Sequence, residues 1–126
     1  MLFTSGEKQR YQIANAVYDW FATQYDLQGV GVEVYHTDLT DDNVFGWCEQ
    51  SDENEFMISI HNELNLDYYV TTLLHELVHV TQTLRGLFDD DEREREAHEL
   101  EMVLYNQFSQ SCWNYQFSQL PLSKNS

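Results

Sequence analysis

The first amphipathic pattern lies near the N-terminus. Thr4 and Glu7 have the spacing of a capping box, in which the two side chains satisfy the first free backbone groups of a helix. Apolar residues then recur at helical intervals, at Ile13, Ala14, Val17, Trp20 and Phe21. This pattern predicts a helix that starts after Thr4 and ends near residues 26–29.

Three segments in the middle of the chain have the pattern of β-strands. Residues 30–35 place a valine at every second position, as a half-buried strand does. Residues 44–49 and 55–60 are rich in strand-forming residues, and the polar residues 50–54 between them predict a hairpin. We therefore expect three strands, with a polar and acidic loop at residues 36–43.

Two further helices are expected in the second half. Residues 67–85 carry apolar side chains at helical spacing, with Asn65 or Asp67 as the candidate N-cap and Gly86 as the stop. Residues 92–108 form the last pattern, with apolar positions at Ala97, Leu100, Val103, Leu104 and Phe108. A short acidic loop separates the two predicted helices.

These elements predict an α+β fold in one domain that spans residues 1–126. A chain of 126 residues buries roughly two thirds of the surface that its unfolded form exposes, so no disulfide or metal is needed to explain folding. The segment beyond the last helix is rich in Ser, Gln and Asn, and we expect residues 117–126 to form a flexible tail.

The charge is strongly acidic, with a formal net charge of −16 and no Lys or Arg between Tyr11 and Leu84. Such a chain repels the phosphate backbone, so we expect no nucleic-acid partner. Protein or peptide partners of basic character are favoured instead. The simpler alternative is that the acidic surface only maintains solubility.

No apolar run approaches the roughly 20 residues of a membrane span, and the N-terminus lacks the apolar core of a signal peptide. We therefore expect a cytoplasmic protein without a membrane partner. Cys48 and Cys112 are too few for a disulfide framework, and both are interpreted as free thiols, with a single bridge as the alternative. The sequence leaves the oligomeric state open.

The segment His75-Glu76-Leu77-Val78-His79 carries the clearest chemical signal. On a helix, residues four apart lie on one face, so His75 and His79 can bind the same ion. This His-Glu-x-x-His spacing provides two imidazoles for Zn²⁺ and a carboxylate, Glu76, placed to take a proton from zinc-bound water. Zinc lowers the pKa of its water toward about 7, which makes a nucleophile available at neutral pH. Hydrolysis of an amide is the expected reaction.

Residues 67–108 resemble the zincin metallopeptidases, and within them the gluzincins, through residues 73–80 and 94–98. The chain is similar to small phage and bacterial members related to the ImmA/IrrE-type peptidases. The resemblance implies a minimal zincin fold in which an edge strand before the active helix holds the substrate, and residues 55–60 would be that strand. The SprT-like zincins are the nearest competing group, but their third ligand is a histidine followed by glycine, and Glu99 follows His98 here.

The third zinc ligand is expected on the last predicted helix. Amphipathicity does not choose between Glu94 and Glu96, which flank its buried face. The resemblance favours Glu94, because gluzincins tend to have a small residue three positions later and a polar one four positions later, here Ala97 and His98. His98 would then orient a ligand imidazole. The alternatives left open are ligation by Glu96, His98, Glu99 or Glu101.

Two further roles and two other functions are considered. Tyr105 is a candidate donor to the developing oxyanion, and a packed core tyrosine is its simpler interpretation. The alternative to a zinc peptidase is a zinc-binding regulatory protein, in which another side chain such as Cys48 or His61 closes the fourth coordination position. A metal-free adaptor that docks onto basic proteins is the third possibility.

Overall fold

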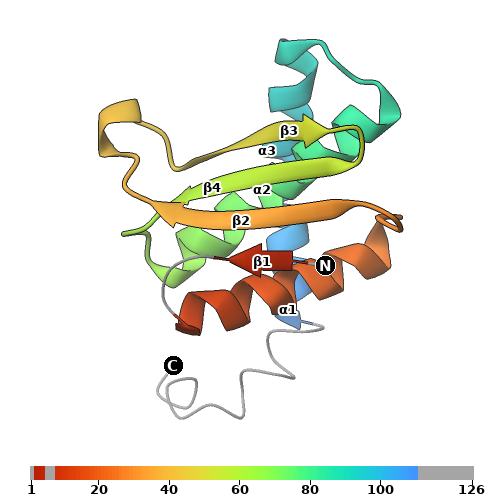
Figure 1. Cartoon of the computed structure of the whole chain (residues 1–126). Helices are drawn as coiled ribbons and strands as arrows, with labels where there is room; N and C mark the ends of the chain where they lie inside the picture. The colour runs from red at the N-terminus through yellow and green to blue at the C-terminus, as the bar shows by residue number, and fades with distance from the viewer. Residues whose placement is uncertain (1, 5–7, 111–126) are drawn as a thin grey trace.

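The computed structural model describes residues 2–4 and 8–110 of the chain (Figure 1). The predicted tail at residues 117–126 and Cys112 lie outside these residues, as do the predictions made for them. The described part is an α+β fold with helices α1 (Lys8–Gln24), α2 (Leu66–Arg85) and α3 (Asp90–Phe108). The predicted fold class is therefore confirmed.

The sheet has four strands, β1 (Leu2–Thr4), β2 (Gly31–Thr37), β3 (Gly46–Asp52) and β4 (Glu55–His61), in the order β1-β2-β4-β3. Strand β2 pairs in parallel with β1 and β4, whereas β3 and β4 form an antiparallel hairpin. The three predicted strands are present, and β1 is an addition. Thr4, which was predicted to cap the first helix, ends β1, and this capping prediction lies outside the described residues because residues 5–7 are not among them.

The expectation that residues 55–60 form an edge strand is wrong. Strand β4 lies between β2 and β3, and its side chains Phe56, Ile58 and Ile60 are fully buried. Strand β3 is the edge, and its last four residues are exposed. Polar, exposed residues suit an edge, because they disfavour pairing with other chains.

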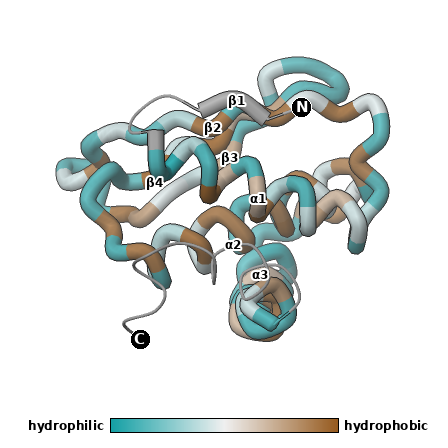
Figure 2. The backbone as a smooth tube through the Cα atoms, turned by 90° about the horizontal axis from the view of Figure 1, so that it is seen from below, coloured by the Kyte–Doolittle hydropathy of each residue, from teal (hydrophilic) through white to brown (hydrophobic). Residues whose placement is uncertain are grey.

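The three helices lie on one side of the sheet, in two layers (Figure 2). Helices α1 and α2 pack on the sheet, and α3 packs on α2 from the far side. Helix α2 is thus enclosed between the sheet and α3, which explains its buried residues on both sides. In the described part of the chain, no helix is long and apolar enough to cross a bilayer.

The ends of α2 and α3 follow local rules. Asn65 caps α2 through a side-chain hydrogen bond from the Tyr68 amide, and Gly86 ends it in a left-handed conformation with φ of 80°. Helix α3 begins earlier than predicted, because Asp89 caps it and the acidic run forms its first turn. Negative charge at that position is favourable to the helix dipole.

Candidate metal centre

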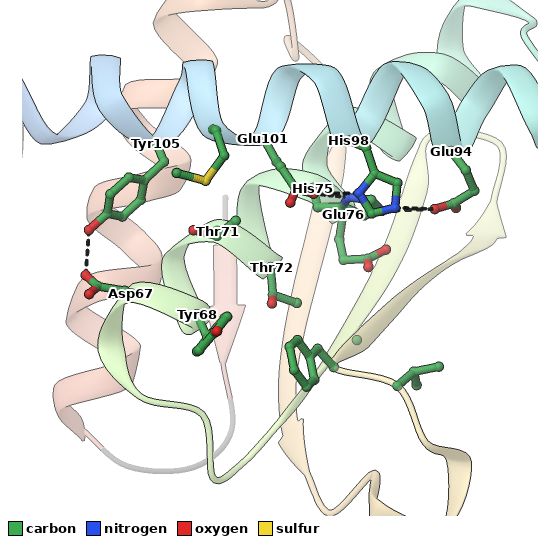
Figure 3. Close-up of a pocket in the computed structure, with 14 residues that line it drawn as sticks. Asp67, Tyr68, Thr71, Thr72, His75, Glu76, Glu94, His98, Glu101 and Tyr105 are labelled. Carbon is green, nitrogen blue, oxygen red and sulfur yellow. Dashed lines mark hydrogen bonds and ion pairs between the residues drawn. The ribbon is translucent and has the colours of Figure 1, made fainter.

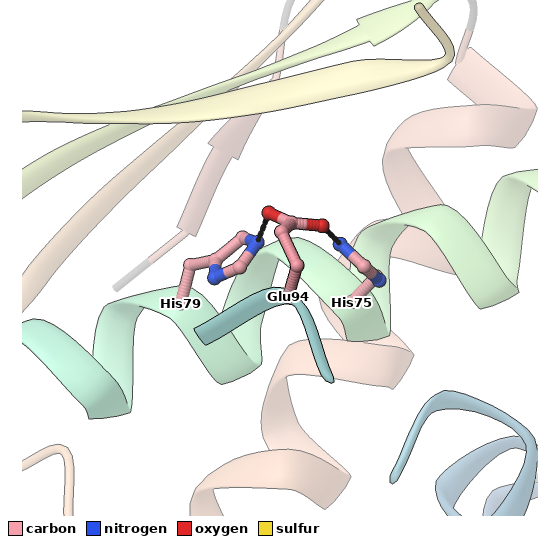
Figure 4. Close-up of side chains that lie close together, drawn as sticks. All are labelled: His75, His79 and Glu94. Atoms are coloured by element: carbon pink, nitrogen blue, oxygen red, sulfur yellow. Dashed lines mark ion pairs between the residues drawn. The ribbon is translucent and has the colours of Figure 1, made fainter. Parts of the chain in front are cut away.

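Two histidines and one glutamate come together between α2 and α3 (Figure 4). His75 and His79 lie one turn apart on α2 and face α3, which contributes Glu94 from its first turns. The Nε2 atoms of His75 and His79 lie 3.3 and 3.0 Å from the two oxygens of Glu94. The ring of His79 is buried, and Glu94 is exposed at the rim.

The other carboxylates that the sequence left open as zinc ligands make different contacts. Glu96 pairs with Arg85 at 2.5 Å and accepts a hydrogen bond from Gln82, away from the histidine pair. Among the described residues, Glu99 belongs to no group of potential ligands. The second such group contains His75, His98 and Glu101, and Glu101 contacts the Nδ1 atom of His75, whereas Glu94 faces its Nε2 atom. The structure therefore brings Glu94, and not Glu96, to the two motif histidines.

Glu101 fixes the orientation of His75. Its carboxylate accepts a hydrogen bond of 2.7 Å from the Nδ1 atom of His75. This orienting role was predicted for His98, but His98 is exposed and lies 3.5 Å from Glu101, with its ring against that of His75. The spacing held a clue, because Glu101 lies seven residues after Glu94 and therefore two turns along the same face of α3.

Gln82 fixes the orientation of His79, a role that was not predicted from the sequence. Gln82 is fully buried, and its amide nitrogen donates to the Glu96 carboxylate at 2.8 Å and to the Arg93 carbonyl at 3.0 Å. Since both of these partners only accept, the amide oxygen must face His79, whose Nδ1–H donates to it at 2.7 Å. The i, i+3 spacing of the two residues on α2 could have indicated this contact.

This hydrogen bonding leaves the Nε2 lone pairs of both histidines pointed at the oxygens of Glu94. Acceptor atoms facing each other at 3.0 to 3.3 Å repel unless a proton or a metal ion lies between them. Burial is the main cause that lowers the pKa of His79, which disfavours the second proton. Two imidazoles and a carboxylate are also a ligand set that zinc uses. The donor set thus fits a zinc ion.

Glu76 points from α2 into a cavity of about 630 Å³ between α2, α3 and residues 44–46 (Figure 3). Its side chain is 5% exposed, and among the described residues none forms a hydrogen bond or ion pair with it. Burial first, and then the charges of Glu94 and Glu101, raise the pKa of Glu76 to about 8.

Position 46, in the cavity wall opposite α3, has no room for a side chain and is a glycine. A Cβ atom on Gly46 would lie 2.8 Å from the Ser59 carbonyl oxygen and 2.9 Å from the Thr72 side chain. The start of β3 therefore runs directly against α2, one turn before Glu76. This contact places the edge strand beside the two helices that carry the candidate site.

Three other residues singled out in the sequence do not contribute ligands to the histidine pair. The Tyr105 hydroxyl donates to Asp67 at 2.5 Å, and Tyr105 is three turns beyond Glu94, about 16 Å along α3. This position does not favour the predicted oxyanion role. His61 accepts a hydrogen bond from the Leu39 amide at 3.0 Å. Within the described residues, neither His61 nor Cys48 belongs to a group of potential metal ligands.

The buried amide of Gln82 gives a direct test of the site. Gln82→Met keeps the length of the side chain but removes the acceptor for His79, so the imidazole loses its fixed orientation. We expect zinc affinity to fall roughly 10- to 100-fold, as for other outer contacts of metal ligands. Competition with a chromophoric chelator measures it, and Gln24→Met on the exposed end of α1 is the matched control. Equal affinity of both variants would contradict the assigned role.

No protein-family model, curated protein or solved structure matches this chain.

Proposed function

We propose that this chain is a zinc-dependent metallopeptidase that hydrolyses peptide bonds in proteins or peptides. One observation carries the proposal. The lone pairs of His75 and His79 converge on Glu94 beside a cavity into which the buried carboxyl of Glu76 points. A zinc ion held by these three residues would supply Lewis acidity, which polarises a carbonyl group and acidifies a water molecule.

The protein's own part in the reaction is to hold the ligands and to move a proton. Glu101 and Gln82 hold the imidazoles of His75 and His79 with Nε2 directed at the centre. Glu76 takes the proton of the attacking water and passes it to the leaving amine, as a general base and then a general acid. Its buried carboxyl lies in the cavity where the peptide bond would bind.

The raised pKa of Glu76 couples this role to the metal. In the metal-free protein, burial and the neighbouring carboxylates keep the pKa of Glu76 at about 8, so the group is mainly protonated at neutral pH. Positive charge at the centre opposes the repulsion by Glu94 and Glu101 and so lowers that pKa. A positively charged centre therefore favours the ionised form of the base at neutral pH.

Strand β3 is the candidate partner for an extended substrate. Since β4 is paired on both sides, β3 is the edge strand on this side of the sheet, and its first residue, Gly46, lines the cavity. The backbone groups on the outer edge of such a strand can pair with an added strand. A peptide bound in this way would pass the cavity that contains Glu76.

The ligand set is tested by zinc titration of single variants. We expect the wild-type chain, purified without a metal-binding tag, to hold about one zinc ion. Glu94→Ala should weaken zinc binding by at least roughly tenfold, because a direct ligand is lost. Glu96→Ala and His98→Ala should bind zinc nearly as the wild type does. Loss of zinc from either of these two variants, with retention by Glu94→Ala, would contradict the assignment.

Activity is tested on a proteome-derived peptide pool, with identification of new termini. We expect cleavage by the zinc-loaded protein, loss after chelation and recovery after zinc is added back. Zinc binding without cleavage of any peptide would instead favour the zinc-binding regulatory protein, and a chain that binds no zinc would favour the metal-free adaptor.

A further inference from the structure

The cavity beside the candidate centre has an apolar wall made of large, exposed side chains. Phe45, Tyr68 and Met102 are 53%, 54% and 51% exposed, and all three line the cavity. The rings of Phe45 and Tyr68 meet edge to face, with centroids 5.6 Å apart. Large apolar groups around a hollow gain free energy when a ligand covers them. The wall therefore suits the carbon chain of a bound side chain.

The charged groups of the cavity are all of one sign. Its carboxylates are Asp67, Glu76, Glu94 and Glu101, and among the described residues no Lys or Arg lines it. Glu94 and Glu101 are paired with histidines, and Glu76 is buried. Asp67 differs from them, because it lies at the opposite end of the cavity from Glu94, as Figure 3 shows, and is exposed.

Asp67 is held in place by Tyr105. The Tyr105 hydroxyl donates to one oxygen of Asp67 at 2.5 Å, which connects the first turn of α2 to α3 across the end of the cavity. Burial, and then the contact with Asp67, raise the pKa of Tyr105, so its hydroxyl remains a donor at neutral pH. Among the described residues, this is the only hydrogen bond that Asp67 makes through its side chain. Its carboxylate can therefore accept from a ligand.

We propose that the cavity is a subsite for a lysine or arginine side chain of the substrate. The aliphatic stem would lie against Phe45, Tyr68 and Met102, and the charged end would pair with Asp67. Basic side chains bury their stems on apolar surface in this way while the head keeps polar contacts. The inference rests on the proposed peptidase function, since the cavity is then next to the reacting peptide bond.

Other side chains fit this cavity less well. An acidic side chain would meet like charges, and an uncharged apolar one would remove water from the Asp67 carboxylate without replacing its hydrogen bonds. A guanidinium or ammonium group replaces them with a charge-assisted contact and can also stack on the exposed rings. Among common side chains, only lysine and arginine combine a long apolar stem with a positive end.

The test compares arginine with citrulline, which has the same shape and no charge. In a peptide that the zinc-loaded protein cleaves, each residue flanking the cleaved bond is replaced in turn by arginine and by citrulline. We expect kcat/KM to be about 10- to 100-fold higher with arginine at one of these positions, the effect of a charged hydrogen bond. Equal values at every position would overturn the proposal.

Asp67→Asn keeps an acceptor for Tyr105 but removes the charge, and should bring the arginine-to-citrulline ratio close to one. Glu63→Gln is the matched control, because it removes one exposed carboxylate that does not line the cavity. It should leave the ratio unchanged. A ratio that Asp67→Asn does not alter, or that Glu63→Gln lowers equally, would overturn the assignment to Asp67.

Binding separates the failure of this inference from the failure of the proposed function. Fluorescent alanine–glycine peptides with a single arginine or citrulline are titrated onto zinc-loaded Glu76→Gln protein, which needs no turnover. The subsite is supported, even if no peptide is cleaved, when two results agree. The arginine peptide binds more tightly than the citrulline peptide, and the double variant with both Glu76→Gln and Asp67→Asn loses this difference. Equal affinity of both peptides overturns the subsite even if the protein is an active peptidase.

Discussion

Glu76→Gln should reduce kcat for peptide hydrolysis by about 10²- to 10⁴-fold, which is the usual effect of losing a general base. Glutamine keeps the size and polarity of the side chain but cannot take a proton from water. Because Glu76 makes no hydrogen bond or ion pair in the described part of the chain, the substitution should disturb no other contact. Zinc content should therefore stay at the wild-type level. Progress curves with a quenched fluorescent peptide measure the rate.

The matched control for this experiment is Glu99→Gln, an exposed glutamate on α3 that belongs to no group of potential ligands in the described residues. Its kcat should equal that of the wild type. If Glu76→Gln protein with bound zinc hydrolyses the peptide as fast as the wild type, Glu76 is not the base. If it loses zinc as well as activity, the rate carries no information on the base, and zinc-saturated protein must be compared.

Local patterns in the sequence predicted most of the fold. The helices follow from apolar spacing, and the ends of α2 at Asn65 and Gly86 follow from capping rules. The order of the strands could not be read in this way, because pairing between β2 and β4 joins segments far apart in the chain. Strand β1 was missed because three residues are too few to make a pattern.

The same distinction between local patterns and long-range packing applies to the residues of the candidate site. His75, Glu76 and His79 were found because helical spacing alone brings the two histidines together. Gln82 and Glu101 were not assigned their contacts, because these depend on how α3 is rotated and shifted against α2. That packing depends on the whole interface between the helices, and no spacing within one helix encodes it. Zinc binding and catalysis themselves remain predictions.

The buried Glu76 should also make the metal-free protein less stable as the pH rises. Its pKa is raised from an ordinary value of 4.5 to about 8 in the folded protein. Between these two values the folded state keeps a proton that the unfolded state has lost, so stability falls with increasing pH. Across this window the loss from this one group is on the order of 4 kcal/mol, at about 1.4 kcal/mol per pH unit.

Urea unfolding of chelator-treated protein at pH 5, 6.5 and 8 measures this loss, and Glu76→Gln isolates it. The variant lacks the buried ionisable group, so its free energy of unfolding minus that of the wild type should rise with pH, because the titration of His79, whose pKa burial lowers, is common to both proteins. The repulsion that accompanies a net charge of −16 acts on both proteins and cancels in the difference. Parallel curves for the two proteins would show that Glu76 does not titrate in this range. Zinc should remove the difference, because binding stabilises the folded state and its charge favours the ionised carboxylate.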